Sequence, residues 1–412
     1  MKIVYIHQYY KTPGEGGAIR SYYLAQALVN AGHQVHMITA GRFRKTDVSD
    51  SNLAIHYMPV QYHNSFGFTR RIFAFIKFLV LSLLEVKKIS NPDLVYATST
   101  PLTVGLIALI LHRRLKLPYI FEVRDIWPEA PIQIGAIRNK WLQKIAYALE
   151  NRIYVSARDL VALSPPVYNY LKEKCPHKRI HLIPNLSDCE LFTPIAPSIT
   201  YNNDNPFKIL YAGAIGKVNN LDLLIQEGQL LKQAKLPVQI MIAGEGSEKH
   251  RLEKFCHKTK LDNFTFLGHL NKFDLVSQFN KVQAVYVGYQ QLPVLETSSP
   301  NKLFDGLAAG KLIIVNIQGW IKDLVETNRC GVFVDSNQPG QLAYKLKPLI
   351  DSPELLKSYQ IQSRLIAEQH FDKKLMIQRF LGIIDQDMKI TRNYKGFFHS
   401  TKTNKKRLAY GS

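Results

Sequence analysis

Short apolar runs alternate with amphipathic segments along almost the whole chain. In the first half, runs that suit buried strands lie near residues 2–8, 34–39, 54–59, 94–98, 119–123, 159–163 and 180–183. Segments whose apolar positions recur with helical spacing lie near residues 18–31, 71–89, 102–114, 139–155 and 165–174. Strands that alternate with helices of this length predict βαβ units and therefore a parallel sheet.

The same alternation starts again after a polar segment, residues 193–206, which contains several Pro and Asn residues. Such a segment is typical of a linker between domains. Beyond it, predicted strands lie near 207–211, 238–243, 264–267, 282–287, 311–315 and 331–334, and predicted helices near 219–232, 247–259, 273–280, 300–309, 321–327, 338–349 and 353–388. We predict an α/β fold of two Rossmann-like domains, residues 1–192 and 207–370, facing each other across a cleft.

The helix expected at 300–309 has an unusual charge at its start. Its boundary residues are typical of a helix, with Ser299 at the N-cap, Pro300 at the first position and Gly310 just beyond the end. The first turn, however, carries Lys302 and no acid, although the helix dipole favours negative charge there. An external anion on the unpaired N–H groups would explain this cation. We therefore predict a phosphate-facing helix, with Asp305 one turn along to hold a hydroxyl-rich group.

Three loops that join a predicted strand to a predicted helix contain glycine. They hold Gly16 and Gly17, then Gly213 and Lys217, and finally Gly244 and Glu245. Glycine lets a backbone approach a ligand closely, and the N–H groups of the following helix would face that ligand. The lysine of the second loop would suit a diphosphate, and the third loop would admit a flat base. A flexible turn, a solvated lysine and simple helix capping are the alternative interpretations.

Charged residues also follow the predicted strand at 119–123. Arg124 and Asp125 come directly after it, and Trp127 lies close behind. Because the carboxyl ends of parallel strands face the cleft, such a cluster is typical of a functional site. The alternative is a structural Arg–Asp pair beside a Trp that fills the core.

The formal net charge of +21 and the isoelectric point of about 9.6 indicate an anionic partner or surface. Nucleic acid, anionic lipid and phosphorylated small molecules all satisfy this requirement. No recognised nucleic-acid module is present, so we predict no nucleic-acid partner. Residues 66–84 are strongly apolar with cations interspersed, which suits either a core helix or an interfacial helix. Residues 390–412 form a basic tail, predicted to be disordered and weakly attracted to an anionic membrane.

The four cysteines are scattered, with no Cys-x-x-Cys and no His at metal spacing. This pattern predicts a reducing compartment without structural disulfides or zinc. The acid pair Asp385 and Asp387 lies in a helical pattern as a solvated face, so we predict no metal site. There is no signal-peptide shape and no stretch of eighteen uncharged apolar residues, so we expect a cytoplasmic chain.

These motifs together resemble the bacterial family-4 glycosyltransferases of the GT-B type. The likeness is closest to the N-acetylfucosamine-transferase-like branch of surface polysaccharide synthesis and covers nearly the whole chain. The matching segments are 16–20, 91–96, 122–129, 211–217 and 299–311. The resemblance implies retaining transfer of a sugar from a nucleotide-diphosphate sugar on the C-terminal domain to an acceptor on the N-terminal domain. It also implies that the final helix, residues 371–389, crosses back to the first domain.

The family's Glu-x7-Glu motif implies roles for particular residues. Its second acid maps onto Asp305, which is then expected to bind the donor ribose. Its first acid maps onto Thr297, which is a departure from the motif, and Glu296 lies one position away as the alternative acid. Ala214 stands where the family often has an Arg for the diphosphate. Lysines therefore become the candidates for that task.

The predicted site follows from these motifs. Its catalytic residues are Arg124, Asp125 and Lys302, and its donor-binding residues are Gly16, Gly17, Gly213, Lys217, Gly244, Glu245, Ser299, Asn301, Lys302 and Asp305. Lysines and helix N-termini can stabilise the charge of the leaving diphosphate without a metal, so no cofactor is expected. No protein nucleophile is evident, which favours front-face transfer in which the departing phosphate helps deprotonate the acceptor. Asp125 is the alternative base.

The leading hypothesis is a glycosyltransferase at the inner face of the plasma membrane, acting in capsule, O-antigen or exopolysaccharide synthesis. Its donor would be a UDP-sugar, on resemblance alone, and its acceptor a polyprenyl-linked saccharide. An anionic membrane surface as partner would account for the net charge of +21. Two alternatives are a nucleotide-sugar 2-epimerase of the same architecture and a non-catalytic, glycosyltransferase-like partner subunit.

Overall fold

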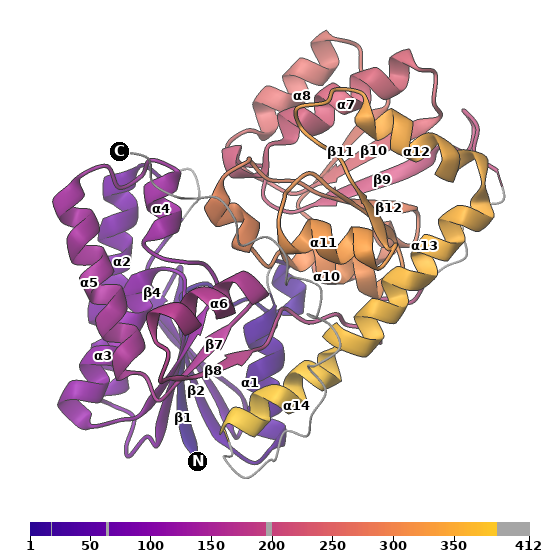
Figure 1. The fold of residues 1–412 in the computed structure, drawn as a ribbon. Helices are drawn as coiled ribbons and strands as arrows, with labels where there is room; N and C mark the ends of the chain where they lie inside the picture. The colour runs from indigo at the N-terminus through magenta and orange to yellow at the C-terminus, as the bar shows by residue number, and fades with distance from the viewer. Residues whose placement is uncertain (18, 63–65, 195–199, 385–412) are drawn as a thin grey trace.

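A computed structural model describes residues 1–17, 19–62, 66–194 and 200–384 of the chain (Figure 1). The predicted basic tail, residues 390–412, and the acid pair Asp385 and Asp387 lie outside the described residues. The described residues form two α/β domains, each built on its own sheet. The predicted fold class, two Rossmann-like domains, is confirmed.

The N-terminal domain contains an eight-stranded sheet of order β3-β4-β2-β1-β5-β6-β7-β8. Its strands are β1 (Lys2–Ile6), β2 (Gln34–Gly41), β3 (Lys45–Asp50), β4 (Leu53–Pro59), β5 (Leu94–Thr98), β6 (Tyr119–Val123), β7 (Asp159–Ala162) and β8 (Arg179–Leu182). Neighbouring strands pair in parallel except β3 and β4, which form an antiparallel edge. The central strands are buried on both faces, as their continuous apolar runs predict.

The C-terminal domain contains a six-stranded, fully parallel sheet of order β11-β10-β9-β12-β13-β14. Its strands are β9 (Phe207–Ala212), β10 (Val238–Ala243), β11 (Phe264–Gly268), β12 (Ala284–Val287), β13 (Leu312–Val315) and β14 (Gly331–Phe333). Strand order reverses beside the first strand of each domain, at β1 and at β9. Ligands of doubly wound folds bind at such switch points, beyond the carboxyl ends of the strands.

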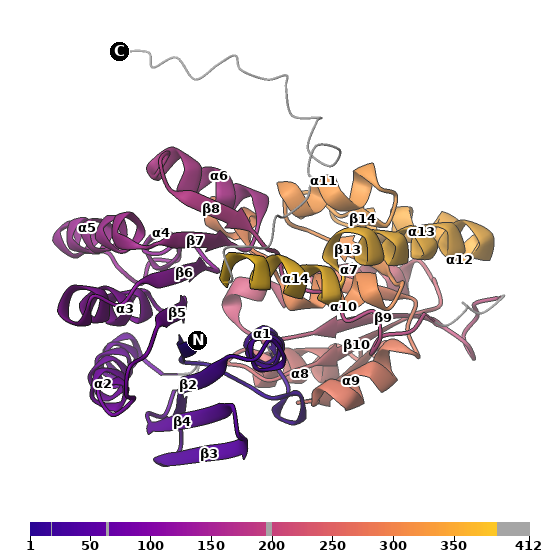
Figure 2. The ribbon, with the colours of Figure 1, turned by 90° about the horizontal axis from the view of Figure 1, so that it is seen from below.

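Helices cover both faces of the first sheet (Figure 2). They are α1 (Arg20–Asn30), α2 (Phe68–Val86), α3 (Leu102–Leu115), α4 (Glu129–Gln133), α5 (Lys140–Ser156) and α6 (Pro165–Lys174). Phe78 of α2, Ile107 of α3 and Ile153 of α5 join one core with Phe121 of the sheet. The helix α1 packs on the opposite face, where Leu24 joins a second core.

The helices of the second domain follow its strands in turn. They are α7 (Leu221–Gln233), α8 (Lys249–Lys258), α9 (Lys272–Phe279), α10 (Asn301–Ala308), α11 (Trp320–Thr327), α12 (Gln341–Asp351) and α13 (Pro353–Ile366). Short helical turns precede some of them, including Pro293–Thr297 before α10. Buried residues of α7, α8, α12 and α13 form one core with the second sheet, whereas those of α9, α10 and α11 belong to a core that also includes the first domain.

The single helix predicted at 353–388 is wrong, because the segment is interrupted. After α13, a π-helical turn at Ala367–Phe371 leads to extended Asp372 and then to α14 (Lys373–Ile384). Asp372 makes the interruption: its side chain accepts from Lys374 N at 2.8 Å, and its backbone bridges to Ser187 of the first domain. Met376 and Phe380 of α14 then pack in the core beneath α1, so this helix crosses back to the first domain (Figure 1).

Candidate functional site

The loops at the carboxyl ends of the two sheets contact each other. His269 Nε2, in the loop after β11, lies 3.2 Å from the carbonyl O of Glu15. A Cβ added at Gly16 would lie 2.8 Å from the carbonyl O of Leu270. Gly16 also has a positive φ of 71°, a region that favours glycine. The contact between the domains therefore requires glycine at position 16, in addition to any role of this residue toward a ligand.

The predicted N-cap at Ser299 is wrong. The helix α10 begins at Asn301, with Pro300 at the cap position, and no described side chain accepts a hydrogen bond as its N-cap. The Ser299 Oγ is buried without a hydrogen-bond partner among the described residues, while Asn185 Nδ2 donates to the Ser299 carbonyl at 2.6 Å. This bond from the other domain fixes the segment so that the hydroxyl does not cap the helix. The first-turn N–H groups are thus left without a side-chain cap.

Lys302 places its amine at the start of α10 between two aromatic rings. The Nζ lies 4.1 Å from the ring centre of Tyr211 and 5.2 Å from that of Tyr289. Burial lowers the pKa of Lys302 to about 7, and no carboxylate in the described ranges forms an ion pair with it. A Cβ at Gly213 would lie 3.7 Å from this Nζ. The glycine loop after β9 therefore lies directly against the amine.

Asp305 lies one turn further along α10 and is paired. Lys272 Nζ lies 2.6 Å from Asp305 Oδ1, and both side chains are buried. Burial raises the pKa of Asp305 although the charge of Lys272 opposes it. A small pocket between the domains is lined by both residues together with Gly17, Arg20, Tyr23, Asp188 and Asn301. The predicted residues Gly17, Asn301 and Asp305 are thus brought together.

Sequence reasoning missed Lys272. It is the first residue of α9, whose N-cap is Asn271, so the local pattern is that of an ordinary helix start. Its Nζ also lies 4.8 Å from the ring centre of Phe192. Only the tertiary fold brings it to Asp305, 33 positions along the chain. A lysine in a predicted strand-to-helix loop was the only signal available.

The two positions considered for the first acid of the motif, Thr297 and Glu296, lie in the turn before α10. Thr297 Oγ1 donates to the carbonyl of Val294 at 2.7 Å within the same turn. Glu296 is half-buried, with its side chain beside Gly319, where an added Cβ would lie 3.5 Å from Glu296 Oε2. Ser164 of the first domain donates to the carbonyl of Thr297 at 2.6 Å. Side-chain hydroxyls of Thr297 and Ser164 therefore hold this turn by its backbone carbonyls.

Arg124 and Asp125 lie at the carboxyl end of β6, on the other side of the cleft. Arg124 N donates to Ser99 Oγ at 3.0 Å. Burial raises the pKa of Asp125 although the charge of Arg124 opposes it, and the charge of Asp125 in turn helps to raise the pKa of Tyr289. Asp125 of one domain and Lys302 of the other thus both interact with Tyr289.

The alternative interpretation of Arg124 and Asp125 as a structural ion pair finds no support. The two side chains form no ion pair within the part of the chain that the structure describes. Trp127, in contrast, does fill space as that interpretation expects, since its ring meets Phe75 edge-on at 6.5 Å between ring centres. Trp127 therefore has a packing role, whereas Arg124 and Asp125 are not explained as a structural ion pair.

A structural ion pair does exist nearby, between Arg20 and Glu122. Both are buried, with Arg20 NH2 3.0 Å from Glu122 Oε2. Thr98 and Tyr96 donate to the same carboxylate, each at 2.6 Å. Burial alone would raise the pKa of Glu122, but these partners and the Arg charges hold it at about 2. Arg20 donates further to the carbonyl of Pro184 at 2.6 Å, so the pair is fully satisfied.

The remaining predicted residues lie in loops of the second domain. Lys217 is exposed and forms no ion pair among the described residues. A Cβ at Gly244 would overlap the carbonyl O of Gly213, so this glycine permits two loops to pack on each other. Glu245 is paired with Lys249, Nζ to Oε1 2.7 Å. Gly244 and Glu245 therefore already have contacts within the domain, and their roles toward a donor stay predictions.

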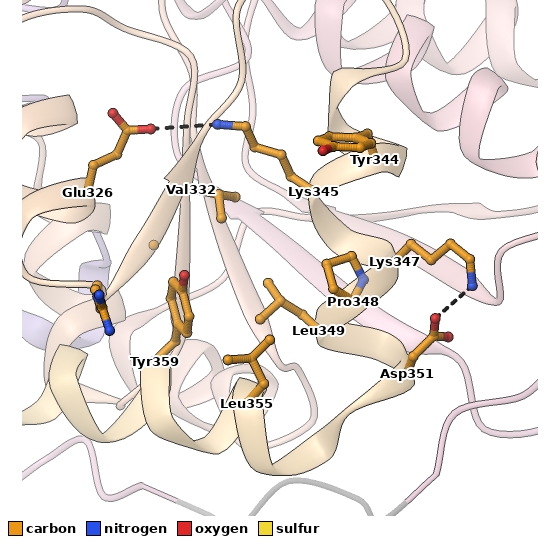
Figure 3. A pocket seen from close by; sticks show the side chains of 12 residues that line it. Glu326, Val332, Tyr344, Lys345, Lys347, Pro348, Leu349, Asp351, Leu355 and Tyr359 are labelled. Carbon is orange, nitrogen blue, oxygen red and sulfur yellow. Dashed lines mark hydrogen bonds and ion pairs between the residues drawn. The ribbon is translucent and has the colours of Figure 1, made fainter.

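A larger hollow lies elsewhere, at the edge strand β14 (Figure 3). It is bounded by α11, α12 and α13 and includes Tyr344 and Tyr359. Two of its cations are already paired, Lys345 with Glu326 at 3.6 Å and Lys347 with Asp351 at 2.6 Å. None of the predicted site residues lines it.

Two further findings concern metals and thiols. Within the described ranges, no group of three or more His, Cys, Asp or Glu side chains could hold a metal ion. The four cysteines are all buried and free. No disulfide is thus formed by the cysteines, and no residue cluster suggests a metal-binding role for them.

The chain matches known families over most of its length. Residues 15–186 match the family described as a glycosyl transferase 4-like domain, and residues 195–365 match glycosyl transferases group 1. The chain belongs to the GT-B glycosyltransferases. The specific N-acetylfucosamine-transferase-like branch is not distinguished by these matches and stays a prediction.

Curated glycosyltransferases resemble parts of the chain. An uncharacterized glycosyltransferase of Methanocaldococcus jannaschii is 22% identical over 254 residues, which cover 62% of this chain and 64% of that protein. The Escherichia coli protein named putative colanic acid biosynthesis glycosyl transferase WcaI is 26% identical over 184 residues, 44% of each chain. The match therefore spans less than two thirds of the length of either relative.

Solved GT-B structures match nearly the whole chain. Sucrose-phosphate synthase of Thermosynechococcus elongatus has a TM-score of 0.72 at 16% identity, covering 93% of this chain and 98% of that chain. HepE of Anabaena, solved in complex with UDP and glucose, has a TM-score of 0.66 at 16% identity, covering 94% and 100%. At these identities, the likeness shows the fold.

Proposed function

We propose that the chain transfers a sugar, with retention of configuration, from a UDP-sugar to a lipid-linked saccharide in surface polysaccharide synthesis. Its membership of the GT-B glycosyltransferases supports the reaction class. The Anabaena neighbour, solved with UDP and glucose, supports a UDP donor. The relative named for colanic acid biosynthesis supports a polysaccharide pathway.

The observation that carries this proposal is the unpaired amine of Lys302. When the bond between sugar and diphosphate breaks, the leaving diphosphate gains negative charge. A preorganised cation and helix N–H groups stabilise such a charge strongly in a site shielded from water. Lys302 lies at the start of α10, whose first turn has no side-chain cap among the described residues. This chemistry requires no metal, because the amine and the N–H groups supply the positive potential.

Asp305 is proposed to accept the ribose hydroxyls of the donor. Its Oδ1 is bonded to Lys272 at 2.6 Å, so a carboxylate oxygen remains for the ribose. Burial raises the pKa of Asp305, and the charge of Lys272 opposes this effect by favouring the ionised carboxylate. An ionised acceptor is what a hydroxyl donor needs, so the pair supports this role.

On the acceptor side, we propose front-face transfer in which the departing phosphate takes the proton of the attacking hydroxyl. Asp125 is the alternative base, because burial raises its pKa and a base is most effective with a pKa nearer the working pH. Arg124, next to it, is proposed to orient the acceptor or the sugar. The two domains would thus contribute the two halves of the reaction.

Sugar transfer from labelled UDP-, GDP- and ADP-sugars in membrane extracts tests the proposal, comparing wild type with Lys302→Met and Asp305→Asn. We expect a UDP-sugar to be used, Lys302→Met to lose transfer and Asp305→Asn to need a higher donor concentration for the same transfer. The exposed Lys281 of the same domain provides a matched control, Lys281→Met, which should keep full activity. Unchanged transfer in Lys302→Met would contradict the proposal, and release of an epimerised nucleotide sugar would favour the 2-epimerase.

A thermal-shift panel of the same nucleotide sugars tests donor choice without an acceptor. A bound ligand raises the apparent stability by mass action, by about 2.7 kcal/mol at a hundredfold excess over Kd. We expect stabilisation by UDP-sugars and none in Lys302→Met. Stabilisation by GDP-sugars alone would exclude the UDP donor while leaving the transfer reaction intact.

A further inference from the structure

The helix α2 has a second apolar face that no part of the described chain covers. Phe75 and Phe78 face the core, as expected for a helix of an α/β domain. Large apolar residues at helical spacing nevertheless lie exposed on the opposite side, namely Ile72, Phe73, Ile76, Val80 and Leu84. Phe73 is 69% exposed. Residues 66–84 therefore contribute to the core, as the first alternative expects, and also present an exposed apolar surface; contact of that surface with a membrane stays a prediction.

The helix α5 shows the same division. Ile153 and Tyr154 are buried beneath it. Trp141, Leu142, Ile145 and Val155 lie exposed on its outer side, and Trp141 is 76% exposed. Single exposed apolar residues are common, but two exposed stripes that include Phe and Trp on one face of a domain are typical of an interaction site.

The two stripes belong to one layer of the N-terminal domain. The helix α3 packs against both α2 and α5, so the three helices lie side by side. Figure 2 shows them in a row on the side of the domain that points away from the C-terminal domain. Helices of βαβ units run antiparallel to their strands, so their N-termini lie at the sheet edge that carries Arg124 and Asp125. The outer layer thus extends to the acceptor side of the cleft.

This layer is also strongly positive. The helices α2, α3 and α5 carry eight cations, namely Arg70, Arg71, Lys77, Arg113, Arg114, Lys140, Lys144 and Arg152. Their only acids are Glu85 and Glu150, both of which are buried. Glu85 pairs with Lys88 at 2.9 Å, and Glu150 pairs with Lys174. No carboxylate of these three helices is therefore exposed to oppose an anionic surface.

We propose that the outer layer of α2, α3 and α5 docks on an anionic lipid bilayer, with Phe73 and Trp141 inserted at the interface. This inference rests on the proposed function, because a lipid-linked acceptor is presented at such a surface. Exposed aromatic and aliphatic residues fringed by Lys and Arg are what interfacial helices use. No described helix is long and apolar enough to span a membrane.

A second copy of the chain suits this surface less well than lipid does. A twofold dimer through the layer would bring eight cations of one copy against the same eight of the other, with no exposed acid of these helices between them. Like charges facing each other across an interface oppose association. Anionic headgroups satisfy the cations and let the acyl region take up the apolar stripes.

Vesicle flotation of the full chain tests the proposal with a double variant, Phe73→Asp with Trp141→Asp. Tyr344→Asp is the matched control, because Tyr344 is an aromatic residue 81% exposed on the C-terminal domain. We expect binding to phosphatidylglycerol–phosphatidylethanolamine vesicles, weakened by salt, and little binding to phosphatidylcholine vesicles. Because burying one large side chain contributes about tenfold in affinity, the double variant should lose about 100-fold. The control variant should bind as wild type does.

Tryptophan fluorescence tests the depth of the same contact. Of the three tryptophans, Trp127 and Trp320 are partly buried and only Trp141 is exposed. Anionic vesicles should shift the emission of the wild type to shorter wavelength. The conservative variant Trp141→Phe should still bind while losing most of that shift. An unchanged emission on binding, or a full shift in Trp141→Phe, would overturn the proposal.

Three other results would also overturn it. One is equal vesicle binding by the double variant and the wild type. A second is loss of all binding on deletion of residues 390–412 with the helices intact. The third is a dimer that the double variant dissociates while vesicle binding is unchanged.

Donor binding distinguishes failure of the docking proposal from failure of the proposed function, because the double variant should keep the thermal shift given by UDP-sugars. Absence of that shift in the wild type would refute the function and leave the docking result standing.

Discussion

Two buried cations, Arg20 in the first domain and Lys302 in the second, lie in opposite electrostatic situations. Arg20 has Glu122 at 3.0 Å and backbone carbonyls at its other nitrogens. Lys302 contacts two aromatic rings and has no carboxylate partner among the described residues, and burial lowers its pKa to about 7. The first arrangement is complete without a ligand, whereas the second lacks a counterion.

The difference separates a structural charge from a binding charge. A buried charge whose hydrogen bonds are satisfied contributes to the packing of its own domain. A buried amine without a partner costs free energy that an incoming anion can recover. The same family motifs contain both, since Arg20 ends the segment 16–20 and Lys302 lies in 299–311. Position in a motif therefore does not by itself assign a residue to the site.

Breaking the satisfied pair should have the largest effect on stability. Arg20→Met leaves the Glu122 carboxylate buried and unpaired, which costs about 3–5 kcal/mol. Urea unfolding of the purified chain measures this loss. The comparison would fail if Arg20→Met unfolded at the same urea concentration as wild type while donor binding disappeared.

Removing the unpaired amine should instead affect activity. Lys302→Met is expected to lower transfer by about 10²–10³-fold, the loss seen when one group that stabilises a developing negative charge is removed. Its free energy of unfolding should not fall, because no ion pair is lost among the described residues. Paired kinetics and urea unfolding measure both quantities. A loss of stability as large as that of Arg20→Met would show that Lys302 is structural.

The two groups should also titrate in separate pH windows. Glu122 has a pKa of about 2 in the folded chain, below the ordinary 4.5, so its contribution is present above pH 4.5 and is lost as the pH falls toward 2. The loss is about 3 kcal/mol at its maximum. The pKa of Lys302 is about 7 in the folded chain, below its ordinary value of 10.5. Between these two pH values the unfolded chain binds more protons than the folded chain, so the free energy of unfolding rises with pH. Urea unfolding at a series of pH values measures both effects. Glu122→Gln should remove the pH dependence of stability at acidic pH, and Lys302→Met should remove the one at alkaline pH.

The smallest expected effect concerns Asp305. Asp305→Asn keeps the size of the side chain but removes the charge that strengthens hydrogen bonds to the ribose, so UDP affinity should fall about tenfold. Isothermal titration measures this affinity. Asp262→Asn is the control, because that acid pairs at the surface with Lys232 and lies far from the predicted site in sequence. Equal UDP affinity in Asp305→Asn and wild type would remove the ribose assignment.

The fold was predictable because parallel strands bury both faces and therefore read as continuous apolar runs. The hairpin strand β3 escaped prediction, since its residues Lys45–Asp50 lie at a sheet edge and show no buried face in their pattern. The five-residue helix α4 is too short to show a helical period. The break between α13 and α14 depends on the contact of Asp372 with Ser187, which no local pattern contains.

The candidate site was predictable where charge contradicted local preference. Lys302 stood out because a cation at a helix start opposes the helix dipole. Lys272 did not stand out, because it follows a good N-cap and meets Asp305 only in the folded chain. Ser299 matched the N-cap pattern, but a hydrogen bond from Asn185 of the other domain determines its position. Contacts between domains are therefore what the local sequence leaves out.

The proton balance of UDP binding tests the central claim that Lys302 is the receptor for the donor diphosphate. With a pKa of about 7, the amine is mostly neutral at pH 8 and must gain a proton to pair with an anion. Titration calorimetry at pH 8, in buffers of different ionisation enthalpy, should show uptake close to one proton, and Lys302→Met should abolish this uptake. UDP binding with no dependence on buffer, or equal uptake in Lys302→Met, would contradict the claim.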